Sequence, residues 1–310
     1  MADNKSIQSS SVLQQDSQTS GRIPMSAGLL LVLLCFLWGA QSVSIKFSNQ
    51  GMPPLMAAAL RSFVAGVLVW IYAGMKNRKV AFPSGQTCHA VMIGILFGLE
   101  FLFLYWSLVY TPVSRSLIFL YTHPFWVAMG AHFFLKGDRL TFAKLFGLIL
   151  AFCGVVAVFQ DRSPKLPDLY LIGDLMALTA AISWAATTLY IKHITMKIKL
   201  DYIQTLFAQL IYSFPLLVLG SVLFELPVSL YLSGVVLASL FYQSVIVAFA
   251  SYLIWFWMIH QHAVSRLAAF TFMTPFFGVV LGGMVLDEPL TLLVWIGLAC
   301  VAGGLYAVNR

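Results

Sequence analysis

Two parts of this chain repeat the same sequence pattern at a separation of about 150 residues. Four matches occur in the same order in both parts, which indicates an internal duplication. Two of the matches are single residues: Trp38 corresponds to Trp184, and Lys46 corresponds to Lys192. The other two are motifs. Val113-Ser114-Arg115 followed by Pro124 corresponds to Val264-Ser265-Arg266 followed by Pro275, and Leu140-Thr141 followed by Gly147 corresponds to Leu290-Thr291 followed by Gly297. A chain built in this way must fold as two related halves.

The composition places both halves in a membrane. The chain is 60% hydrophobic and only 9% charged, whereas soluble domains carry about 25% charged residues. A membrane-spanning helix needs about 20 mainly apolar residues. Ten segments meet this requirement, namely 25–46, 54–75, 90–110, 114–135, 142–160, 170–193, 202–224, 230–257, 264–286 and 290–308.

Each segment of the first half is five spans away from its counterpart in the second half. Because five is an odd number of membrane crossings, the two counterparts run in opposite directions across the membrane. The sequence therefore predicts an all-α membrane protein of ten transmembrane helices, arranged as two inverted five-helix repeats. Secondary transporters use such repeats to expose one site alternately to the two sides of a membrane. We expect a first repeat over 25–160, an outer connecting loop over 161–169 and a second repeat over 170–310.

The distribution of Lys and Arg predicts the orientation. With the N-terminus inside, thirteen of the eighteen basic residues fall in inner segments, four in outer segments and Arg61 in a span. Cytoplasmic loops are the basic ones, so both termini are expected in the cytoplasm. Residues 1–24, rich in Ser and Gln, are expected to form a disordered cytoplasmic tail. The expected location is the inner or plasma membrane.

Other functional classes find little support in the residues. The net charge of +7 is spread over short loops, which indicates a lipid bilayer rather than nucleic acid as partner. No HExxH or GxxxxGK motif is present, so neither a zinc enzyme nor ATP-driven transport is indicated. No cofactor or metal is expected. A membrane-embedded enzyme and a channel remain alternatives to a carrier, and the sequence leaves the oligomeric state open.

Several motifs together resemble the EamA-type branch of the drug/metabolite transporter superfamily over residues 26–308. They are Leu37-Trp38-Gly39, Leu60-Arg61-Ser62-Phe63, Tyr110-Thr111-Pro112-Val113-Ser114, Ser251-Tyr252-Leu253-Ile254-Trp255-Phe256 and Asp287-Glu288-Pro289-Leu290-Thr291. The chain has Gly137-Asp138-Arg139 where members often have Gly-Glu-Arg, and Asp287-Glu288 where they often have Gly-Glu. Both changes keep an acid.

The resemblance implies a carrier of small organic metabolites, with exporters of amino acids among its relatives. It also implies that spans 1, 3, 4, 6, 8 and 9 line a central cavity and that spans 5 and 10 are peripheral. From this analogy we expect an exporter of an amino acid or a related small-molecule substrate.

Two ionisable residues lie deep within spans. Arg61 is in the second span and Glu100 near the middle of the third. Charged groups at this depth usually face a partner or a wet cavity. Glu100 is a candidate proton-linked switch or ligand for a substrate amino group, and Arg61 is its candidate charge partner. Alternatively, the two pair with one another and hold the helices together.

Polar and aromatic residues in the spans supply further cavity candidates. These are Trp38, Gln41, His123, Trp126, Trp184, Tyr252 and Trp255. Aromatic rings could hold an apolar or cationic part of a substrate. Interfacial anchoring or packing is the alternative for each ring, and His123 could instead serve the kink at Pro124.

Four basic residues at span ends form two repeat pairs, Lys46 with Lys192 and Arg115 with Arg266. Their depth favours topology anchors that reach the lipid head groups. Symmetric gate residues are the alternative reading.

Overall fold

The computed structural model describes residues 23–111, 113–135, 137–160, 169–226, 230–286 and 292–309. In the first half the helices are α2 (Met25–Ser48), α3 (Pro54–Met75), α4 (Thr87–Tyr110), α5 (Val113–Leu120), α6 (His123–Phe134) and α7 (Phe142–Gln160). In the second half they are α8 (Tyr170–Thr195), α9 (Tyr202–Phe224), α10 (Gly234–Phe241), the π-helix η1 (Tyr242–Ser251), α11 (Tyr252–Gln261), α12 (Val264–Phe270), the 3₁₀ turn η2 (Thr271–Met273), α13 (Thr274–Leu286) and α14 (Leu292–Asn309).

These elements form the ten helical segments that the sequence predicts. Within the described residues, seven helices are long and apolar enough to cross a membrane, and the apolar stretches 142–157 and 295–308 are shorter. The remaining segment, the ninth in chain order, is the broken run α12–η2–α13. Most of the tail over 1–24 and the loop over 161–169 lie outside the described residues.

One boundary prediction is wrong by four residues at each end. The eighth segment was expected over 230–257, but it runs from Gly234 to Gln261. Residues 226–265 contain no charged side chain, so hydropathy alone marks no edge there. The edge comes from Ser233, whose hydroxyl caps the helix by accepting a hydrogen bond from the Val236 amide at 3.3 Å.

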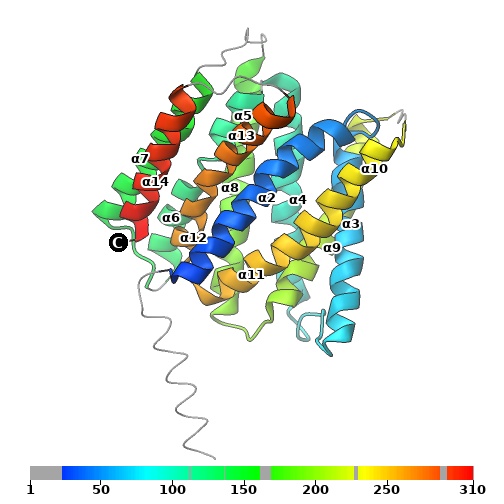
Figure 1. Cartoon of the computed structure of the whole chain (residues 1–310). Helices are drawn as coiled ribbons and strands as arrows, with labels where there is room; N and C mark the ends of the chain where they lie inside the picture. Colours follow the sequence, from blue (N-terminus) through cyan, green and yellow to red (C-terminus); the bar gives the residue numbers. More distant parts are fainter. Residues whose placement is uncertain are drawn as a thin grey trace, which may run out of the picture.

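Successive segments alternate in direction, and the second half is inverted relative to the first (Figure 1). The segments of the first half run up, down, up, down and up in that view, and those of the second half begin downward. We call the end at which α2 begins the lower end. The last helix, α14, finishes at this same end (Figure 1), as expected for a protein with ten spans.

Two spans break at the repeated prolines. The fourth span is interrupted between Leu120 and His123, just before Pro124, and the ninth passes through the 3₁₀ turn just before Pro275. Proline lacks an amide hydrogen and clashes with the preceding turn, so both halves bend at equivalent positions. Pro215 is also within a span, but α9 continues through it.

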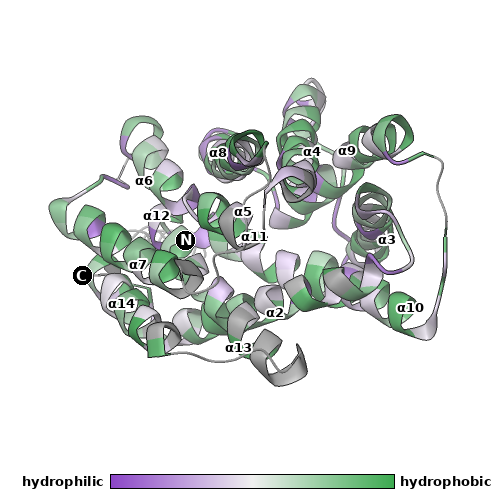
Figure 2. Cartoon of the chain, turned by 90° about the horizontal axis from the view of Figure 1, so that it is seen from above, coloured by the Kyte–Doolittle hydropathy of each residue, from purple (hydrophilic) through white to green (hydrophobic). Residues whose placement is uncertain are grey.

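Helices α7 and α14 pack against each other at one edge of the bundle, remote from α3, α9 and α10 (Figure 2). A Cβ added to Gly304 would lie 2.4 Å from the Gly147 oxygen, and one added to Gly154 would lie 2.5 Å from the Gly297 oxygen. The two backbones therefore touch at two levels, as small residues permit in membranes. This edge position agrees with the peripheral role implied for spans 5 and 10.

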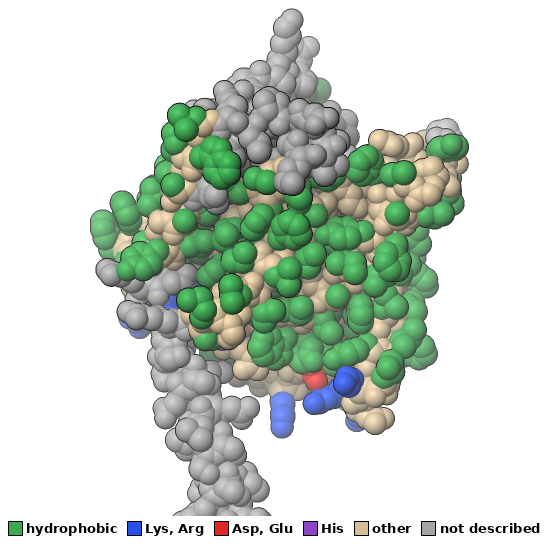
Figure 3. Space-filling model, in the orientation of Figure 1, with side chains coloured by type: hydrophobic (Ala, Val, Ile, Leu, Met, Phe, Trp, Pro, Cys, Tyr) green, Lys and Arg blue, Asp and Glu red, His purple; other side chains and the backbone are tan. Residues whose placement is uncertain are grey.

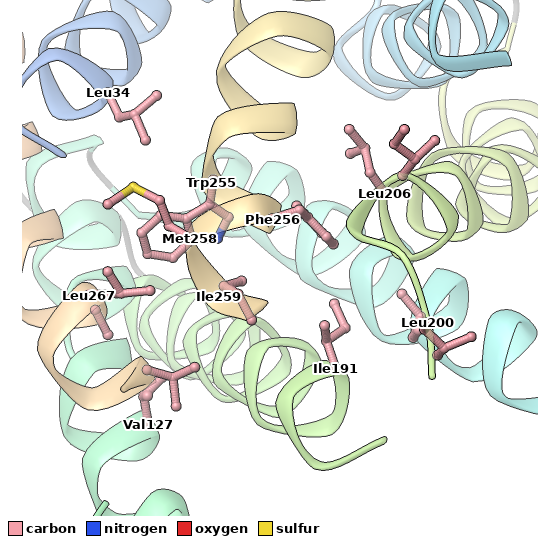
Figure 4. Close-up of a cluster of buried hydrophobic side chains, with 14 of the residues drawn as sticks. Leu34, Val127, Ile191, Leu200, Leu206, Trp255, Phe256, Met258, Ile259 and Leu267 are labelled. Carbon is pink, nitrogen blue, oxygen red and sulfur yellow. The ribbon is translucent and has the colours of Figure 1, made fainter. Parts of the chain in front are cut away.

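The largest apolar cluster surrounds α11 in the lower half of the bundle (Figure 4). Trp255, Phe256, Met258 and Ile259 of this helix pack against side chains from α2, α6, α8, α9 and α12. The outer surface is also apolar, with side chains such as Trp70 60% exposed. Figure 3 shows this apolar surface, with Lys and Arg side chains gathered at the lower end. Such a surface is suited to lipid rather than water.

Candidate functional site

Arg61 of α3 and Glu100 of α4 lie in the interior, where the two halves meet. Arg61 is 0% exposed and Glu100 is 6% exposed. The guanidinium carbon of Arg61 lies 4.2 Å from the centre of the Phe101 ring and 6.0 Å from that of the Tyr252 ring. Phe101 and Tyr252 follow Glu100 and Ser251, which correspond in the repeat alignment. Arg61 thus lies close to equivalent rings of the two repeats.

Neither charged group has its hydrogen-bonding capacity filled. All three side-chain nitrogens of Arg61 and the Oε2 oxygen of Glu100 lack a partner among the described residues. Arg61 acts electrostatically on Glu100, but the described residues show no direct ion pair between them. A buried polar group without a partner costs about 1–3 kcal/mol, and a charged one more. The pair is therefore suited to receive charged groups from a ligand.

Aromatic side chains frame this pair. Trp38 of α2 donates a hydrogen bond through Nε1 to Ser251 Oγ at 2.9 Å. Its ring lies edge-on to Tyr252 at 6.2 Å and to Trp255 at 5.2 Å between centroids. Phe97 completes the frame, with its centroid 4.7 Å from Phe101 and 6.3 Å from Tyr252. Three of the predicted cavity residues, Trp38, Tyr252 and Trp255, are thus brought together.

A second cluster forms around the two proline breaks. The imidazole of His123 stacks on Trp184, with centroids 3.7 Å apart and planes at 9°. Both ring nitrogens of His123 and the hydroxyl of Thr274 are buried without a partner among the described residues. His123 and Thr274 are repeat mates, because each immediately precedes its proline. Tyr121 borders the same cluster, 6.4 Å from Trp184 between centroids.

Helix α2 connects the two clusters. Cys35, one turn before Trp38, donates through Sγ to the Phe270 carbonyl at 3.2 Å, beside the break in the ninth span. Gln41, three residues beyond Trp38, is buried on the same helix. Trp126 instead donates through Nε1 to Thr122 Oγ1 at 3.2 Å, which ties its half-buried ring to the kink in the fourth span.

Two of the basic residues at span ends, Lys192 and Arg266, lie away from this centre. Lys192 donates through Nζ to the carbonyls of Ile259 at 2.8 Å and His260 at 3.4 Å. It thereby caps the C-terminal end of α11, where a cation is favoured. Arg266 is half-buried near the start of α12, at the lower end. The side chains of Lys46 and Arg115 lie outside the described part of the chain.

A buried polar network at the lower end joins the two halves, and sequence reasoning missed it. Lys144 Nζ donates to Asp138 Oδ1 at 2.7 Å and to Ser265 Oγ at 3.1 Å. The Ser265 amide donates to Asp138 Oδ2 at 3.1 Å, and its hydroxyl donates to Asp138 Oδ1. Burial raises the pKa of Asp138, but these hydrogen bonds and the Lys144 charge outweigh it and lower the pKa overall. Asp138 therefore stays ionised and fastens α12 to the loop before α7.

The described residues contain no group of three His, Cys, Asp or Glu side chains that could hold a metal. The polar groups that meet in the interior are instead a cation, a carboxylate, an imidazole and hydroxyls, set among aromatic rings. This arrangement is suited to holding a small polar solute.

Comparison with known proteins identifies the family. The profile of the EamA-like transporter family matches residues 25–160 and again residues 171–310. The chain belongs to the EamA-like transporter family. The resemblance seen in the motifs is thereby confirmed, as are the all-helical membrane fold and its duplication. The chain is a multi-pass membrane transporter and not an enzyme.

Similar proteins span nearly the whole chain. A "Probable amino-acid metabolite efflux pump" of Escherichia coli (strain K12) is 26% identical and aligns over 90% of this chain and 93% of its own length. The "Uncharacterized transporter YvbV" of Bacillus subtilis (strain 168) is 28% identical over 91% of this chain and 90% of its own. A solved crystal structure superposes with a TM-score of 0.79 at 19% identity, covering 92% of this chain and 96% of the other, which shows a shared fold.

Proposed function

We propose that this transporter exports a zwitterionic metabolite of the amino-acid class, and that the substrate binds between Arg61 and Glu100. The observation that carries the proposal is the pair of buried, incompletely partnered charges on α3 and α4. A substrate carboxylate would accept hydrogen bonds from Arg61, and a substrate ammonium would donate to Glu100. The names of the relatives from Escherichia coli and Salmonella typhimurium support this class of substrate and the direction of export.

The surrounding rings define the rest of the binding site. Near Arg61, an apolar frame for a substrate side chain is offered by five rings, those of Trp38, Tyr252, Trp255, Phe97 and Phe101. His123 and Thr274 supply polar groups in the second cluster, which α2 connects to that frame. Substrates with a flat or apolar side chain fit this lining better than those with a second charge.

The fold supplies the mechanism of transport. The site lies where the inverted halves meet, so that rocking one half against the other exposes it first to one side and then to the other. The Asp138–Lys144–Ser265 network joins the halves at the lower end and must part or shift when that end opens. Because described Lys and Arg side chains gather at the lower end, we assign that end, with both termini, to the cytoplasm.

A ligand series tests the substrate assignment. The thermal stability of the purified protein is measured with an amino acid, with the amine that lacks its carboxylate and with the acid that lacks its amino group. The wild type should respond most strongly to the zwitterion. A charge-assisted hydrogen bond contributes about 1.5–3 kcal/mol, so each truncated ligand should bind about 10- to 100-fold more weakly.

Variants locate the two charges. Arg61→Gln should bind the zwitterion no better than the amine, because the variant cannot recognise the carboxylate. Glu100→Gln should bind the zwitterion no better than the acid, because the variant cannot recognise the ammonium group. Leu60→Ala is the control, because Leu60 adjoins Arg61 but is 37% exposed on the outside of α3. A wild type that prefers the amine or the acid to the zwitterion, or variants that leave both preferences unchanged, would contradict the assignment.

A further inference from the structure

A buried polar contact joins the two repeats above the central site, towards the end opposite the Asp138 network. Gln243 of η1 donates through Nε2 to Ser48 Oγ at 3.1 Å and to Ser44 Oγ at 3.4 Å, near the end of α2. Ser44 in turn donates to the Ser239 carbonyl of α10 at 3.2 Å. Figure 1 shows the end of α2 beside α10 in this region. We call Ser44, Ser48, Ser239 and Gln243 the upper seam.

The hydrogen bonds of the upper seam are incomplete. The hydroxyls of Ser44 and Ser48 both donate to backbone carbonyls, Ser48 to that of Ile45 at 3.0 Å. They can therefore only accept from Gln243, which places the Nε2 side of its amide towards α2. The Oε1 oxygen of Gln243 is left without a partner among the described residues, although the side chain is 0% exposed. A buried oxygen in this state makes the closed seam less stable than a fully bonded one.

The π-helix η1 carries the upper seam at one end and a contact of the central site at the other. Gln243 is its second residue, and Ser251, its last, accepts the hydrogen bond from Trp38. Between these contacts, the Tyr242 hydroxyl donates to the Leu37 carbonyl at 3.0 Å. π-Helical turns are rare and are frequent at functional sites. The same element therefore holds α2 both at the seam and at the rings around Arg61.

We propose that the upper seam is the gate between the central site and the side of the membrane opposite the termini, and that the Gln243 amide keeps this gate reversible. In the closed gate Nε2 is bonded and Oε1 is not. When α2 moves away from η1, water satisfies both ends of the amide, so opening recovers the cost of the buried oxygen. The inference rests on the proposed alternating exposure of the central site, but not on the identity of the substrate.

Two substitutions of Gln243 should move the gate in opposite directions. Methionine has a similar length and no hydrogen-bonding need, so Gln243→Met removes the unpartnered oxygen and favours the closed gate. Ser44 and Ser48 keep their carbonyl acceptors in this variant. Gln243→Glu favours the open gate at pH 8, because both burying the carboxylate and protonating it at that pH are costly. A residue that served only to hold the helices together would loosen the contact in both variants.

The reactivity of an introduced cysteine measures the gate. Gln41 is buried on α2 between Trp38 and Ser44, so Gln41→Cys places a thiol below the seam. A charged, membrane-impermeant maleimide is applied at pH 8 to oriented vesicles from the side opposite the termini, and labelling of the chain without this substitution is subtracted. Added to Gln41→Cys, Gln243→Met should slow the labelling about tenfold, and Gln243→Glu should accelerate it.

A neighbouring substitution and the opposite side of the membrane provide the controls. Ser244→Ala should leave labelling unchanged, because Ser244 adjoins Gln243 and is buried, but its hydroxyl donates to the Leu240 carbonyl of the preceding turn rather than to α2. Labelling from the side of the termini should not fall in Gln243→Met, since a closed upper gate leaves the lower end able to open.

The outcomes separate the gate from the substrate assignment. Faster labelling in both Gln243 variants, unchanged labelling in Gln243→Met, or an equal fall from both sides in Gln243→Met would overturn the proposal. If Gln243→Glu fails to fold, the comparison of the two sides in Gln243→Met decides. No substrate is added, so a failed gate test leaves the Arg61–Glu100 assignment standing, and a failed ligand series leaves the gate standing.

Discussion

At the scale of single residues, the interior of this transporter is defined by polar groups without partners. Arg61, Glu100, His123 and Thr274 are all buried, and each has at least one side-chain atom without a partner among the described residues. In stable interiors the large majority of buried side-chain polar atoms have a hydrogen-bond partner. We propose that this concentration of exceptions, where the two repeats meet, marks a binding site.

The sequence predicted most of these residues singly, but it did not predict how they pair. Depth within a span singled out Arg61 and Glu100, and the repeat singled out Trp38 and Trp184. The hydrogen bond from Trp38 to Ser251 and the stacking of Trp184 on His123 depend on how spans far apart in the chain pack. Spacing along one helix cannot reveal such contacts. Thr274 could have been found as the repeat mate of His123.

Replacing the carboxylate of Glu100 tests its role in transport. Glu100→Gln keeps the size and one hydrogen-bonding oxygen but removes the charge and the exchangeable carboxyl proton. We expect the variant to reach the membrane at normal yield and to lose substrate flux, or to transport without the pH dependence of the wild type. Flux in proteoliposomes as a function of pH measures both. Flux and a pH profile identical to those of the wild type would remove Glu100 from the mechanism.

Breaking the Asp138–Lys144 pair tests the buried network at the lower end. Asp138→Asn leaves the Lys144 ammonium buried without its counter-charge, and breaking such a pair typically costs about 3–5 kcal/mol. We expect a clear fall in the Tm, largely recovered in the double variant Asp138→Asn/Lys144→Met. A single variant as stable as the wild type would show that the pair contributes nothing.

The same network makes a prediction about pH. The pKa of Asp138 is lower in the folded protein than in the unfolded chain. Its contribution to stability is therefore fully present above the ordinary pKa of aspartate and is lost only as the pH falls through the lowered value. The Tm difference between the wild type and Asp138→Asn should thus be constant between pH 5 and pH 8. A difference that shrinks towards pH 5 would contradict the assigned direction of the pKa shift.

At the scale of helices, hydropathy and the repeat give the segments, and local chemistry sets their edges. Segments such as 54–75 and 202–224 are bounded by charges, prolines or caps in the sequence, and their ends are predicted correctly. The eighth segment lies in a run without charges, so its ends were misplaced. The sequence patterns also did not predict the π-helix within this segment, Tyr242–Ser251. It ends at Ser251, the acceptor of the Trp38 hydrogen bond.

Adjacent glycines on α14 provide a matched test of the contact between α7 and α14. A Cβ on Gly304 would lie 2.4 Å from the Gly147 oxygen, whereas a Cβ on Gly303 would meet only the Leu150 side chain at 3.5 Å. Gly304→Ala should lower the Tm by an amount equivalent to about 1–3 kcal/mol, and Gly303→Ala should leave it nearly unchanged. Size-exclusion chromatography after heating measures both. Equal stability of the two variants would argue against backbone contact at this edge.

At the scale of the whole molecule, the inversion of the repeats explains how a buried site can serve transport. Two inverted halves that rock against each other expose the site between them alternately to the two sides of the membrane. Equivalent residues from the two halves, Phe101 and Tyr252, both lie close to Arg61, so the proposed site draws on both repeats. The duplication predicted two inverted halves from the sequence, but not which residues meet between them. Depth within the second span had made Arg61 the candidate charge partner of Glu100, although the family resemblance assigned the cavity lining to other spans.

The most direct test of the central claim is counterflow in proteoliposomes. Vesicles preloaded with an unlabelled zwitterionic substrate, identified in the ligand series, are diluted into a trace of the labelled compound. A site exposed to one side at a time predicts saturable uptake of label that internal substrate accelerates, and the loss of this uptake in Arg61→Gln. Uptake that rises linearly with concentration and ignores the internal substrate would mean an open pore and would contradict the account.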